Sequence, residues 1–321
     1  MPALPLITHE RADAVIAWRD GAPVTAAAFV AAARTLAARL PAGTHTLHLC
    51  ADRYYFALAT AAALLAGRCT LLPPTQAPAV LAALQAMAPD MICLADGGTG
   101  EGILAQLHCP VLQVPIDAGA PGKREPGLSE WTVPRIPADQ RAALIFTSGS
   151  TGTPVPHAKT FGALVRSVRA EAARLPSLAR RGCAIVGTVP PQHMFGFEST
   201  VLLPLQSSGA ICAQRPFFPA DVAAALQRLP RPRLLCTTPV HLRALVQARC
   251  ALPPLDLILC ATAMLEQHLA REVEGRYGAP LLEIYGSTET GQIASRHTTR
   301  EQAWRLWPRV RVTLTGQQCW A

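Results

Sequence analysis

Short apolar runs alternate with stretches of helical character along most of the chain. Ala142–Phe146 and Leu257–Cys260 are apolar throughout, which is typical of strands buried inside a sheet. Phe161–Ala173 instead spaces its apolar residues mainly by three and four, which indicates a helix. Because strands alternate with helices, the pattern predicts an α/β fold whose sheets are mostly parallel and carry helices on both faces.

The same patterns predict the individual elements. We expect strands at 13–18, 46–50, 70–72, 91–94, 142–146, 184–189, 210–213, 234–237, 257–260 and 281–285, and helices at 24–40, 54–66, 77–87, 161–173, 199–205, 219–228, 239–248 and 266–277.

Gly- and Pro-rich stretches at 97–100 and 117–137 indicate loops between two parts of the fold. We therefore expect a first α/β subdomain at 1–137 and a second at 138–304, which begins with the strand 142–146. Within 305–321, Arg309–Leu314 alternates polar and apolar side chains, which predicts a half-exposed strand. The Thr-Gly-Gln turn that follows makes this segment the expected start of a β-hairpin.

Composition indicates a globular protein, because 50% of the residues are hydrophobic and only 16% are charged. The longest apolar stretch, Phe56–Gly67, is too short to span a bilayer. The chain opens without a cationic and apolar leader. We therefore expect a cytoplasmic protein with no membrane insertion.

Cysteine and arginine usage narrows the classes further. The ten cysteines form no Cys-x-x-Cys pair, and Cys69, Cys93, Cys236 and Cys260 lie in apolar runs, which indicates reduced core thiols. The net charge of +8 comes mostly from scattered arginines. Nucleic-acid binding is not expected without a clustered basic stripe, whereas attraction to an acidic partner fits this charge.

The stretch Thr147–Lys159 has the chemistry of a loop that binds polyphosphate. Two glycines allow the backbone to approach a ligand closely, and four hydroxyls add hydrogen-bond donors. Successive backbone N–H groups in such a turn can form an anion-binding concavity. A helix that leaves the loop at Phe161 would add its N-terminus to the site.

Two common phosphate-binding patterns do not fit this stretch. A Walker loop needs Gly-Lys-Ser/Thr after four residues, and Pro154 stands where its second glycine would be. The Gly-x-Gly-x-x-Gly spacing of dinucleotide-binding proteins is also absent, which counts against an oxidoreductase. A flexible Ser/Gly linker is the alternative, but the predicted strand and helix on either side favour a binding loop.

Three motifs resemble the adenylate-forming superfamily of acyl-CoA synthetases, aryl-acid ligases and adenylation domains. Thr147–Gly152 with Pro154 is similar to its phosphate loop, and Tyr285–Glu289 is similar to its Tyr-Gly-x-Thr-Glu motif. Pro190–Gly196 resembles more loosely its segment beside the acyl carboxylate. The resemblance implies the large N-terminal domain of these enzymes, with two stacked α/β subdomains and the start of a small β-barrel. The small C-terminal lid domain, with its catalytic lysine, has no counterpart in this chain.

The resemblance implies a two-step reaction. A carboxylate attacks the α-phosphate of ATP to give an acyl adenylate and pyrophosphate, and a thiol then takes the acyl group. Positioning and charge neutralisation supply most of the catalysis in such a displacement. The resemblance implies ATP and Mg²⁺ as cofactors.

The motifs also imply roles for individual residues. The β- and γ-phosphates would be held by Thr147, Ser148, Gly149, Ser150, Thr151 and Gly152. Glu289 would bind magnesium and Thr288 the α-phosphate, and the alternative for such a Thr-Glu pair is a helix N-cap. The nucleotide site would further include Ala261, Thr262, Ala263, Glu283, Tyr285, Gly286 and Ser287, with Tyr285 placed to stack on adenine.

The chain departs from the family after Pro154, where Val155 occupies the position of the usual lysine. Lys159 or His157 could supply the missing positive charge, since a lysine acts on phosphate as a point charge. The alternative is that Lys159 lies in solvent at the start of a helix.

An acyl pocket is expected around the third motif. The resemblance implies that His193 faces the acyl carboxylate, although an isolated histidine is more often structural. The remaining walls would come from Phe195, Gly196, Phe197, Thr238, Tyr285 and Gly286.

The segments after Pro154 and around His193 are most similar to ligases of xanthomonadin and aryl polyene clusters. That similarity implies a 3- or 4-hydroxybenzoate-type acid and an acyl carrier protein, rather than CoA, as the thiol acceptor. The alternatives are a fatty acyl-CoA or acyl-AMP ligase, or a nucleotide-binding core without efficient turnover because the lid is missing.

Overall fold

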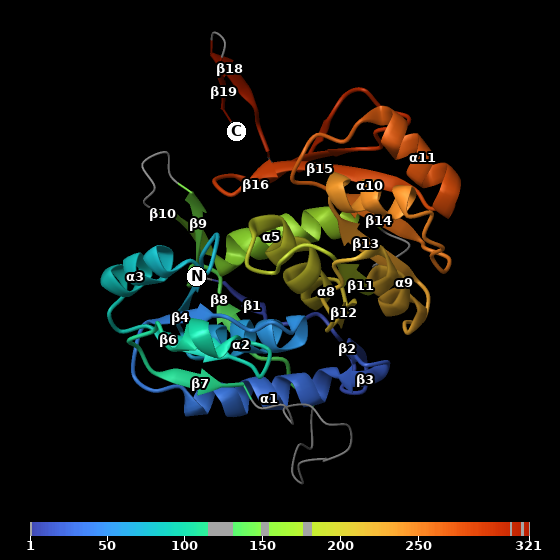
Figure 1. The fold of residues 1–321 in the computed structure, drawn as a ribbon. Helices are drawn as coiled ribbons and strands as arrows, with labels where there is room; N and C mark the ends of the chain where they lie inside the picture. The colour runs from blue at the N-terminus through green and yellow to red at the C-terminus, as the bar shows by residue number, and fades with distance from the viewer. Residues whose placement is uncertain are drawn as a thin grey trace.

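The computed structural model describes residues 2–114, 131–148, 154–175, 182–308, 310–315 and 318–320. Two large sheets dominate these residues, and helices lie between the sheets and on their outer faces (Figure 1). The α/β fold with mostly parallel sheets is therefore confirmed.

The first large sheet has six strands, and all its neighbours are parallel except β10 and β9. In spatial order its strands are β10 (Pro154–Thr160), β9 (Arg141–Ser148), β5 (Cys69–Leu72), β4 (His45–His48), β6 (Ile92–Ala95) and β7 (Val111–Gln113).

The second large sheet has nine strands, and its five central pairs are parallel. In spatial order its strands are β17 (Arg305–Leu306), β16 (Gly291–Arg296), β15 (Leu281–Ser287), β14 (Leu257–Cys260), β13 (Arg233–Thr237), β11 (Ala184–Gly187), β12 (Ala210–Cys212), β2 (Val15–Arg19) and β3 (Ala22–Thr25).

Successive side chains of a strand point to opposite faces of its sheet, which explains how the second sheet buries both of its faces. Leu234 and Leu259 point into a large core that both sheets share, while Leu235 and Ile258 point into a second core on the outer face. The outer face carries α9 (Pro219–Gln227), α10 (Pro239–Gln247) and α11 (Gln267–Tyr277). The shared core holds α2 (Arg53–Leu65) and α5 (Phe161–Ala173).

Helix α2 shows why a helix can be apolar on every side. It contacts β4 and β5 of the first sheet and β12 of the second, and it packs against α1 (Ala26–Arg39). All its residues from Arg53 to Leu64 are buried. The remaining helices of the first half are α3 (Pro78–Met87) and α4 (Glu101–Leu104).

Sheet membership differs from the predicted division at 137/138. Strands β2 and β3, from the N-terminal part, form an edge of the second sheet, and β9 and β10 complete the first sheet. The expectation that the strand 142–146 opens the second subdomain is therefore wrong. Local patterns show that a segment is a strand, but the partner of the strand depends on contacts far away in the chain.

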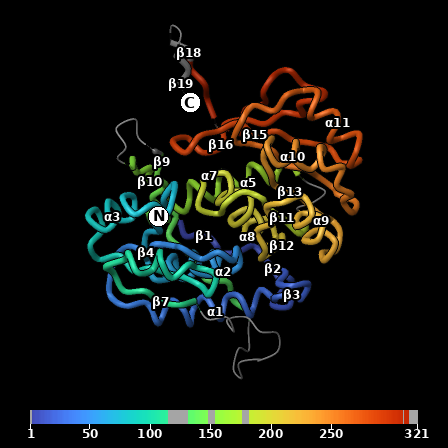
Figure 2. Tube along the Cα trace, in the orientation of Figure 1, coloured from blue at the N-terminus to red at the C-terminus, as the bar shows by residue number. Residues whose placement is uncertain are grey.

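Two small antiparallel sheets complete the fold. One joins β1 (Ala3–Pro5) to β8 (Arg135–Pro137), and the other is the hairpin of β18 (Thr313–Thr315) and β19 (Gln318–Trp320). The hairpin projects away from the two large sheets (Figure 2). The strand expected at Arg309–Leu314 thus begins later, at Thr313.

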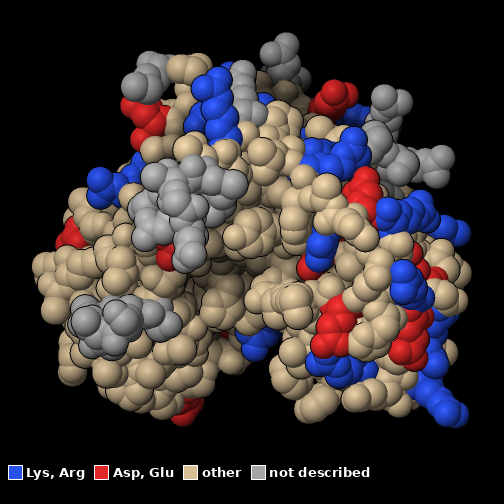
Figure 3. Space-filling model, turned by 90° about the horizontal axis from the view of Figure 1, so that it is seen from above, with Lys and Arg blue, Asp and Glu red and all other residues tan. Residues whose placement is uncertain are grey.

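The structure also bears on what the composition predicted about cysteines, surface charge and membrane spans. Cys69, Cys93, Cys236 and Cys260 are buried free thiols. Basic and acidic side chains are interspersed on the face in Figure 3, and a hollow with mostly uncharged walls lies between its two halves. No helix in the described part of the chain has the length and apolar character to cross a membrane.

Candidate functional site

The predicted phosphate loop belongs to a β-hairpin. Strand β10 pairs antiparallel with β9, with Val155 opposite Thr147 and Lys159 opposite Ala143. Helix α5 begins only at Phe161, after the seven residues of β10. The expectation that a helix N-terminus follows the loop directly is therefore wrong, because the segment after the loop forms an edge strand of the first sheet.

Four residues of the predicted loop, Gly149, Ser150, Thr151 and Gly152, lie outside the described residues. Ser148 ends β9, and nothing is described of its side chain. The structure therefore locates the loop only through the strands on either side of it.

The base of the hairpin meets the turn that carries Glu289. His157 Nε2 lies 3.1 Å from Thr147 Oγ1 and 3.7 Å from Glu289 Oε1. Hydrogen bonding from Ser287 is the main cause that lowers the pKa of Glu289, and His157 and Lys159 lower it further. Glu289 is therefore a carboxylate at neutral pH, and its side chain is 53% exposed.

Lys159 is bound to the same turn. Its Nζ donates a 2.6 Å hydrogen bond to the backbone oxygen of Glu289. Burial lowers the pKa of Lys159, while Glu198 and Glu289 oppose the change. The alternative of a solvated lysine at a helix start is therefore wrong, since Lys159 lies within β10 and joins the hairpin to the Glu289 turn.

The helix N-cap alternative for Thr288-Glu289 is also wrong. Both residues lie in the turn between β15 and β16, which pair antiparallel. This turn puts Ser287 and Thr288 on the wall of a pocket, while Glu289 faces the β9–β10 hairpin.

The pocket has a volume of about 470 Å³. It brings together most of the residues predicted for the nucleotide and acyl sites outside the phosphate loop. Those that line it are His193, Phe195, Gly196, Thr238, Ala261, Thr262, Gly286, Ser287 and Thr288.

Backbone geometry shapes two parts of this wall. Gly196 passes so close to Pro190 that a Cβ would collide with the Pro190 carbonyl oxygen. Thr262 has φ of +82°, which is rare for a β-branched residue. Such strain is often concentrated at ligand sites, and Thr262 is one of the residues predicted for the nucleotide site.

Besides the loop, Lys159 and Glu289, four predicted site residues do not line the pocket. Phe197 is fully buried and packs edge-on against Phe56. Tyr285 is 53% exposed, and its ring lies 5.4 Å from that of Trp304. Ala263 is exposed next to Thr262. The fourth is Glu283.

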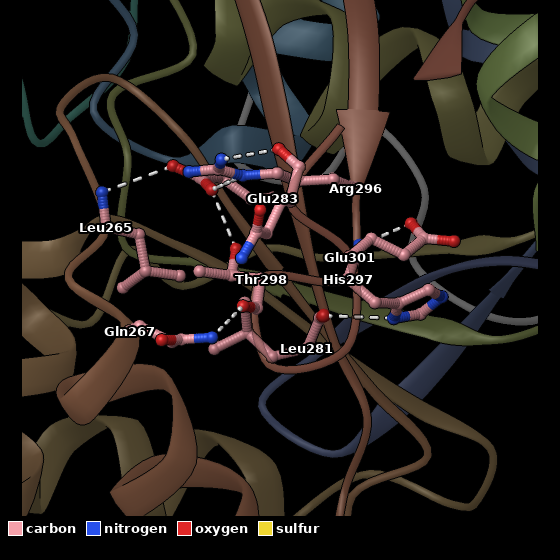
Figure 4. A network of polar contacts seen from close by, with 9 residues as sticks. Leu265, Gln267, Leu281, Glu283, Arg296, His297, Thr298 and Glu301 are labelled. Carbon is pink, nitrogen blue, oxygen red and sulfur yellow. Dashed lines mark hydrogen bonds and ion pairs between the residues drawn. The ribbon is translucent and has the colours of Figure 1, made fainter. Parts of the chain in front are cut away.

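Glu283 holds a structural network beside the site (Figure 4). Its Oε2 accepts from Arg296 Nε and from Thr298 Oγ1, both at 2.7 Å, and its Oε1 accepts from the backbone N–H of Leu265 at 3.2 Å. All of its polar contacts in the described structure are thus within the protein. The predicted role of Glu283 in cofactor binding has no support from its position.

His193 stands at the start of α7 (Met194–Gly196), which lies beside β16 (Figure 2). Burial of the ring lowers its pKa, and the charge of Arg215 lowers it further. The imidazole is therefore neutral at pH 7, with one nitrogen that donates and one that accepts.

Sequence reasoning missed three polar residues at the pocket. Glu198 and Gln292 line it. Arg53 does not line it but donates a hydrogen bond to the carbonyl oxygen of Val189, which does. Arg53 donates hydrogen bonds to the carbonyl oxygens of Gly187, Val189 and Gln214. An arginine inside the all-apolar pattern of α2 was the available signal for Arg53, and Glu198 directly follows the recognised motif.

Comparison with known proteins decides the family. The sequence profile described as AMP-binding enzyme matches residues 8–319. The chain belongs to the AMP-binding enzyme family. The resemblance of the phosphate-loop and Tyr285–Glu289 motifs to adenylate-forming enzymes is thereby confirmed at the level of the family.

Curated members of the family show partial similarity. A 4-coumarate–CoA ligase of Rhodobacter capsulatus is 34% identical over 154 residues, which are 48% of this chain and 39% of that protein. An indoleacetate–CoA ligase of Aromatoleum aromaticum is 32% identical over 170 residues, which are 51% of this chain and 32% of that protein. The aligned segments therefore span less than half of these relatives.

Solved structures share the fold of the family. The o-succinylbenzoate CoA synthetase of Bacillus subtilis, in complex with its acyl-adenylate intermediate, has a TM-score of 0.74 and 20% identity. The match covers 93% of this chain and 62% of that one. The same synthetase in complex with ATP and magnesium has a TM-score of 0.72, 20% identity, and coverage of 89% and 60%.

Proposed function

We propose that this chain is the large N-terminal part of an ATP-dependent acid–thiol ligase. A carboxylate substrate would attack the α-phosphate of ATP, giving an acyl adenylate and pyrophosphate, and a thiol would then take the acyl group. The observation that carries the proposal is that the β9–β10 hairpin contacts the β15–β16 turn, and that this turn also lines the pocket. His157 contacts both Thr147 and Glu289, while Thr288 in the same turn lines the pocket.

The chemistry of Glu289 fits a magnesium site. Magnesium prefers one or two carboxylates, completed by phosphate oxygens and water. Glu289 offers an ionised and accessible carboxylate beside β10, the strand that follows the loop. When bound, the metal would neutralise negative charge on the pyrophosphate group. The loop residues 147–152 are proposed to hold the β- and γ-phosphates, as their resemblance implies.

We propose an aryl acid as the substrate. The pocket is lined by Phe195 together with the apolar residues Val189, Met194 and Ile284, which suits a flat ring. Two of the relatives are named for 4-coumarate and indoleacetate, although another is named for medium-chain fatty acids. The segment after Pro154 departs from the usual family pattern and is similar to ligases of xanthomonadin and aryl polyene clusters. This similarity further supports a hydroxybenzoate-type acid, with an acyl carrier protein rather than CoA as the acceptor.

The neutral His193 is proposed to orient the acyl carboxylate. It lies at the pocket and can donate a hydrogen bond without adding a positive charge that would hold the carboxylate too firmly. Thr288, which also lines the pocket, is proposed to bind the α-phosphate.

A pyrophosphate-exchange screen tests the proposal. The chain would be supplied with MgATP and, in turn, with benzoates, cinnamates and fatty acids. We expect exchange that depends on an aryl acid, and hydroxylamine should trap the adenylate as a hydroxamate. Tight ATP binding with no acid-dependent exchange would instead support a nucleotide-binding core, and absence of MgATP binding would reject the proposed function.

Replacing Lys159 by methionine is expected to weaken MgATP binding by about tenfold while acid binding changes less. The Nζ hydrogen bond to the Glu289 backbone is charge-assisted, and such bonds contribute about 1.5–3 kcal/mol. Calorimetric titration with ATP, with and without magnesium, provides the measurement.

Lys159→Arg is the matched control, because it keeps the charge and a donor. If Lys159 acts through Glu289, the loss should be larger with magnesium present than without it. An equal loss in both conditions would show direct action on phosphate, and unchanged ATP affinity would reject both roles.

A further inference from the structure

Glu198 is a buried carboxyl on the wall of the pocket. It lies in a π-helical segment, η1 (Phe197–Leu202), which follows α7 without a break. Single π-helical turns are frequent at functional sites. The residue is only 1% exposed, and neither carboxyl oxygen has a hydrogen-bond partner within 3.5 Å among the described residues.

The surroundings of Glu198 come from four elements. Lys159 approaches from β10 and Glu171 with Ser167 from α5. Met194 of α7 and Gly291 of β16 close the remaining side, and a Cβ on Gly291 would lie 3.5 Å from Glu198 Oε1. With φ of +76°, Gly291 adopts a backbone conformation that favours glycine.

This environment favours the uncharged carboxyl. Burial raises the pKa of Glu198 to about 8, and the charge of Glu171 raises it further. The hydroxyl of Ser167, which is near enough to stabilise the charged carboxylate, and the charge of Lys159 oppose the shift without cancelling it. An uncharged carboxyl offers one donor and at least one acceptor to a ligand.

A second unsatisfied acceptor lies on the same pocket. Gln292 donates from Nε2 to Glu171 Oε2 at 2.8 Å, which turns its amide so that Nε2 faces α5. Its Oε1 is buried and has no hydrogen-bond partner among the described residues. Glu198 and Gln292 therefore offer unused hydrogen-bonding capacity at one pocket.

The pocket also carries other polar residues, namely His193, Thr238, Thr262, Ser287 and Thr288. Thr238 and Ser287 already pair with His241 and Thr290, and the others belong to the proposed carboxylate and nucleotide sites. Val189, Met194, Phe195 and Ile284 contribute apolar surface to this pocket. A hydrogen-bonding group on the acyl part of a ligand would thus find its partners mainly at Glu198 and Gln292. Buried polar groups are normally hydrogen-bonded. The unused hydrogen-bonding capacity of Glu198 and Gln292 therefore points to a ligand group that pairs with them.

We propose that Glu198, together with Gln292, selects an acid that carries a hydroxyl group away from its carboxylate. The inference rests on the proposed function, since it assigns the substrate class of the same pocket. A hydroxyl matches the site because it can donate to one acceptor and accept from the carboxyl. An acid without the hydroxyl would leave both buried groups unpaired, and sites of this kind discriminate strongly against such analogues.

Binding of acyl-sulfamoyl adenosines tests the inference without turnover. These compounds mimic an acyl adenylate and can carry a benzoyl, 3-hydroxybenzoyl or 4-hydroxybenzoyl group. We expect wild-type protein to bind one hydroxybenzoyl compound at least about tenfold more tightly than the benzoyl compound by calorimetry. Glu198→Leu should reduce this ratio to about one, and Glu198→Gln should retain part of it.

Asp96→Asn is the matched control, since it changes another buried carboxyl that does not line the pocket. It should leave the ratio of the two affinities as in wild type, and thermal melts of all variants report on folding. An equal affinity of wild type for all three compounds would overturn the selection but leave the proposed function standing. Failure of every compound to bind would overturn both.

Discussion

Replacing Glu289 by alanine is expected to lower magnesium-dependent pyrophosphate exchange at least about a hundredfold. Glu289 is the accessible carboxylate that the structure places against the phosphate hairpin, 3.7 Å from His157. Without it, the negative charge that develops on pyrophosphate would lose its metal-mediated neutralisation. The rate is measured by isotope exchange with the best acid of the screen, across a range of magnesium concentrations.

The expected loss is specific to the reaction and not to folding. The Glu289 side chain is half exposed, and the bond from Lys159 goes to its backbone oxygen, which alanine retains. The melting temperature should therefore stay close to that of wild type. Glu272→Ala, an exposed change on α11, is the matched control and should leave the rate unchanged. Exchange at the wild-type rate in Glu289→Ala would reject the assignment of the metal site.

Replacing Arg53 by methionine is expected to destabilise the fold by about 3 kcal/mol or more. Arg53 is fully buried between the two sheets, and its guanidinium donates to the carbonyl oxygens of Gly187, Val189 and Gln214 at 2.8–2.9 Å. Burial lowers the pKa of Arg53 to about 10, so it remains charged at neutral pH. Methionine fills part of the space but leaves these carbonyl groups without donors.

The same change should also disturb the pocket. Val189 lines it and receives one of the hydrogen bonds from Arg53. Urea denaturation gives the free energy of unfolding, and calorimetry gives the affinity for an acyl-sulfamoyl adenosine under conditions where the variant is folded. Arg34→Met on the exposed face of α1 should cost no more than about 0.5 kcal/mol. A comparably small cost for Arg53→Met would show that the carbonyl groups find other partners.

The local patterns predicted most of the regular elements because periodicity is a property of short segments. The strand at 257–260 and the helix at 161–173 were predicted at the bounds that the structure shows. The segment 154–160 was misinterpreted as a loop, since two prolines obscure its strand character. The helix expected at 199–205 is instead a run of α7, η1 and α8 (Leu203–Gln206), with a π-helical segment that no periodicity indicated.

The candidate site was predicted in part. Three residues predicted from motif positions, Gly196, Thr262 and Thr288, line one pocket in the structure, although they lie far apart in the chain. Phe197 was misplaced because it turns into the core beside Phe56, whereas its neighbours Gly196 and Glu198 face the pocket. Which side of a short helical turn faces a cavity depends on the elements packed around it, and a motif does not contain that information.

The sequence by itself determined the class of fold, the family motifs and the departure at Val155, because each of these is encoded within a short segment. Only the tertiary structure decided that β9 and β10 join the first sheet, that Lys159 binds the Glu289 turn, and that Glu198 lies unpaired on the pocket wall. These outcomes depend on contacts between segments that are far apart in the chain, or on the burial that such contacts create. Burial and pairing set the charge and the free hydrogen-bonding capacity of a side chain, and these properties give the pocket its expected chemistry.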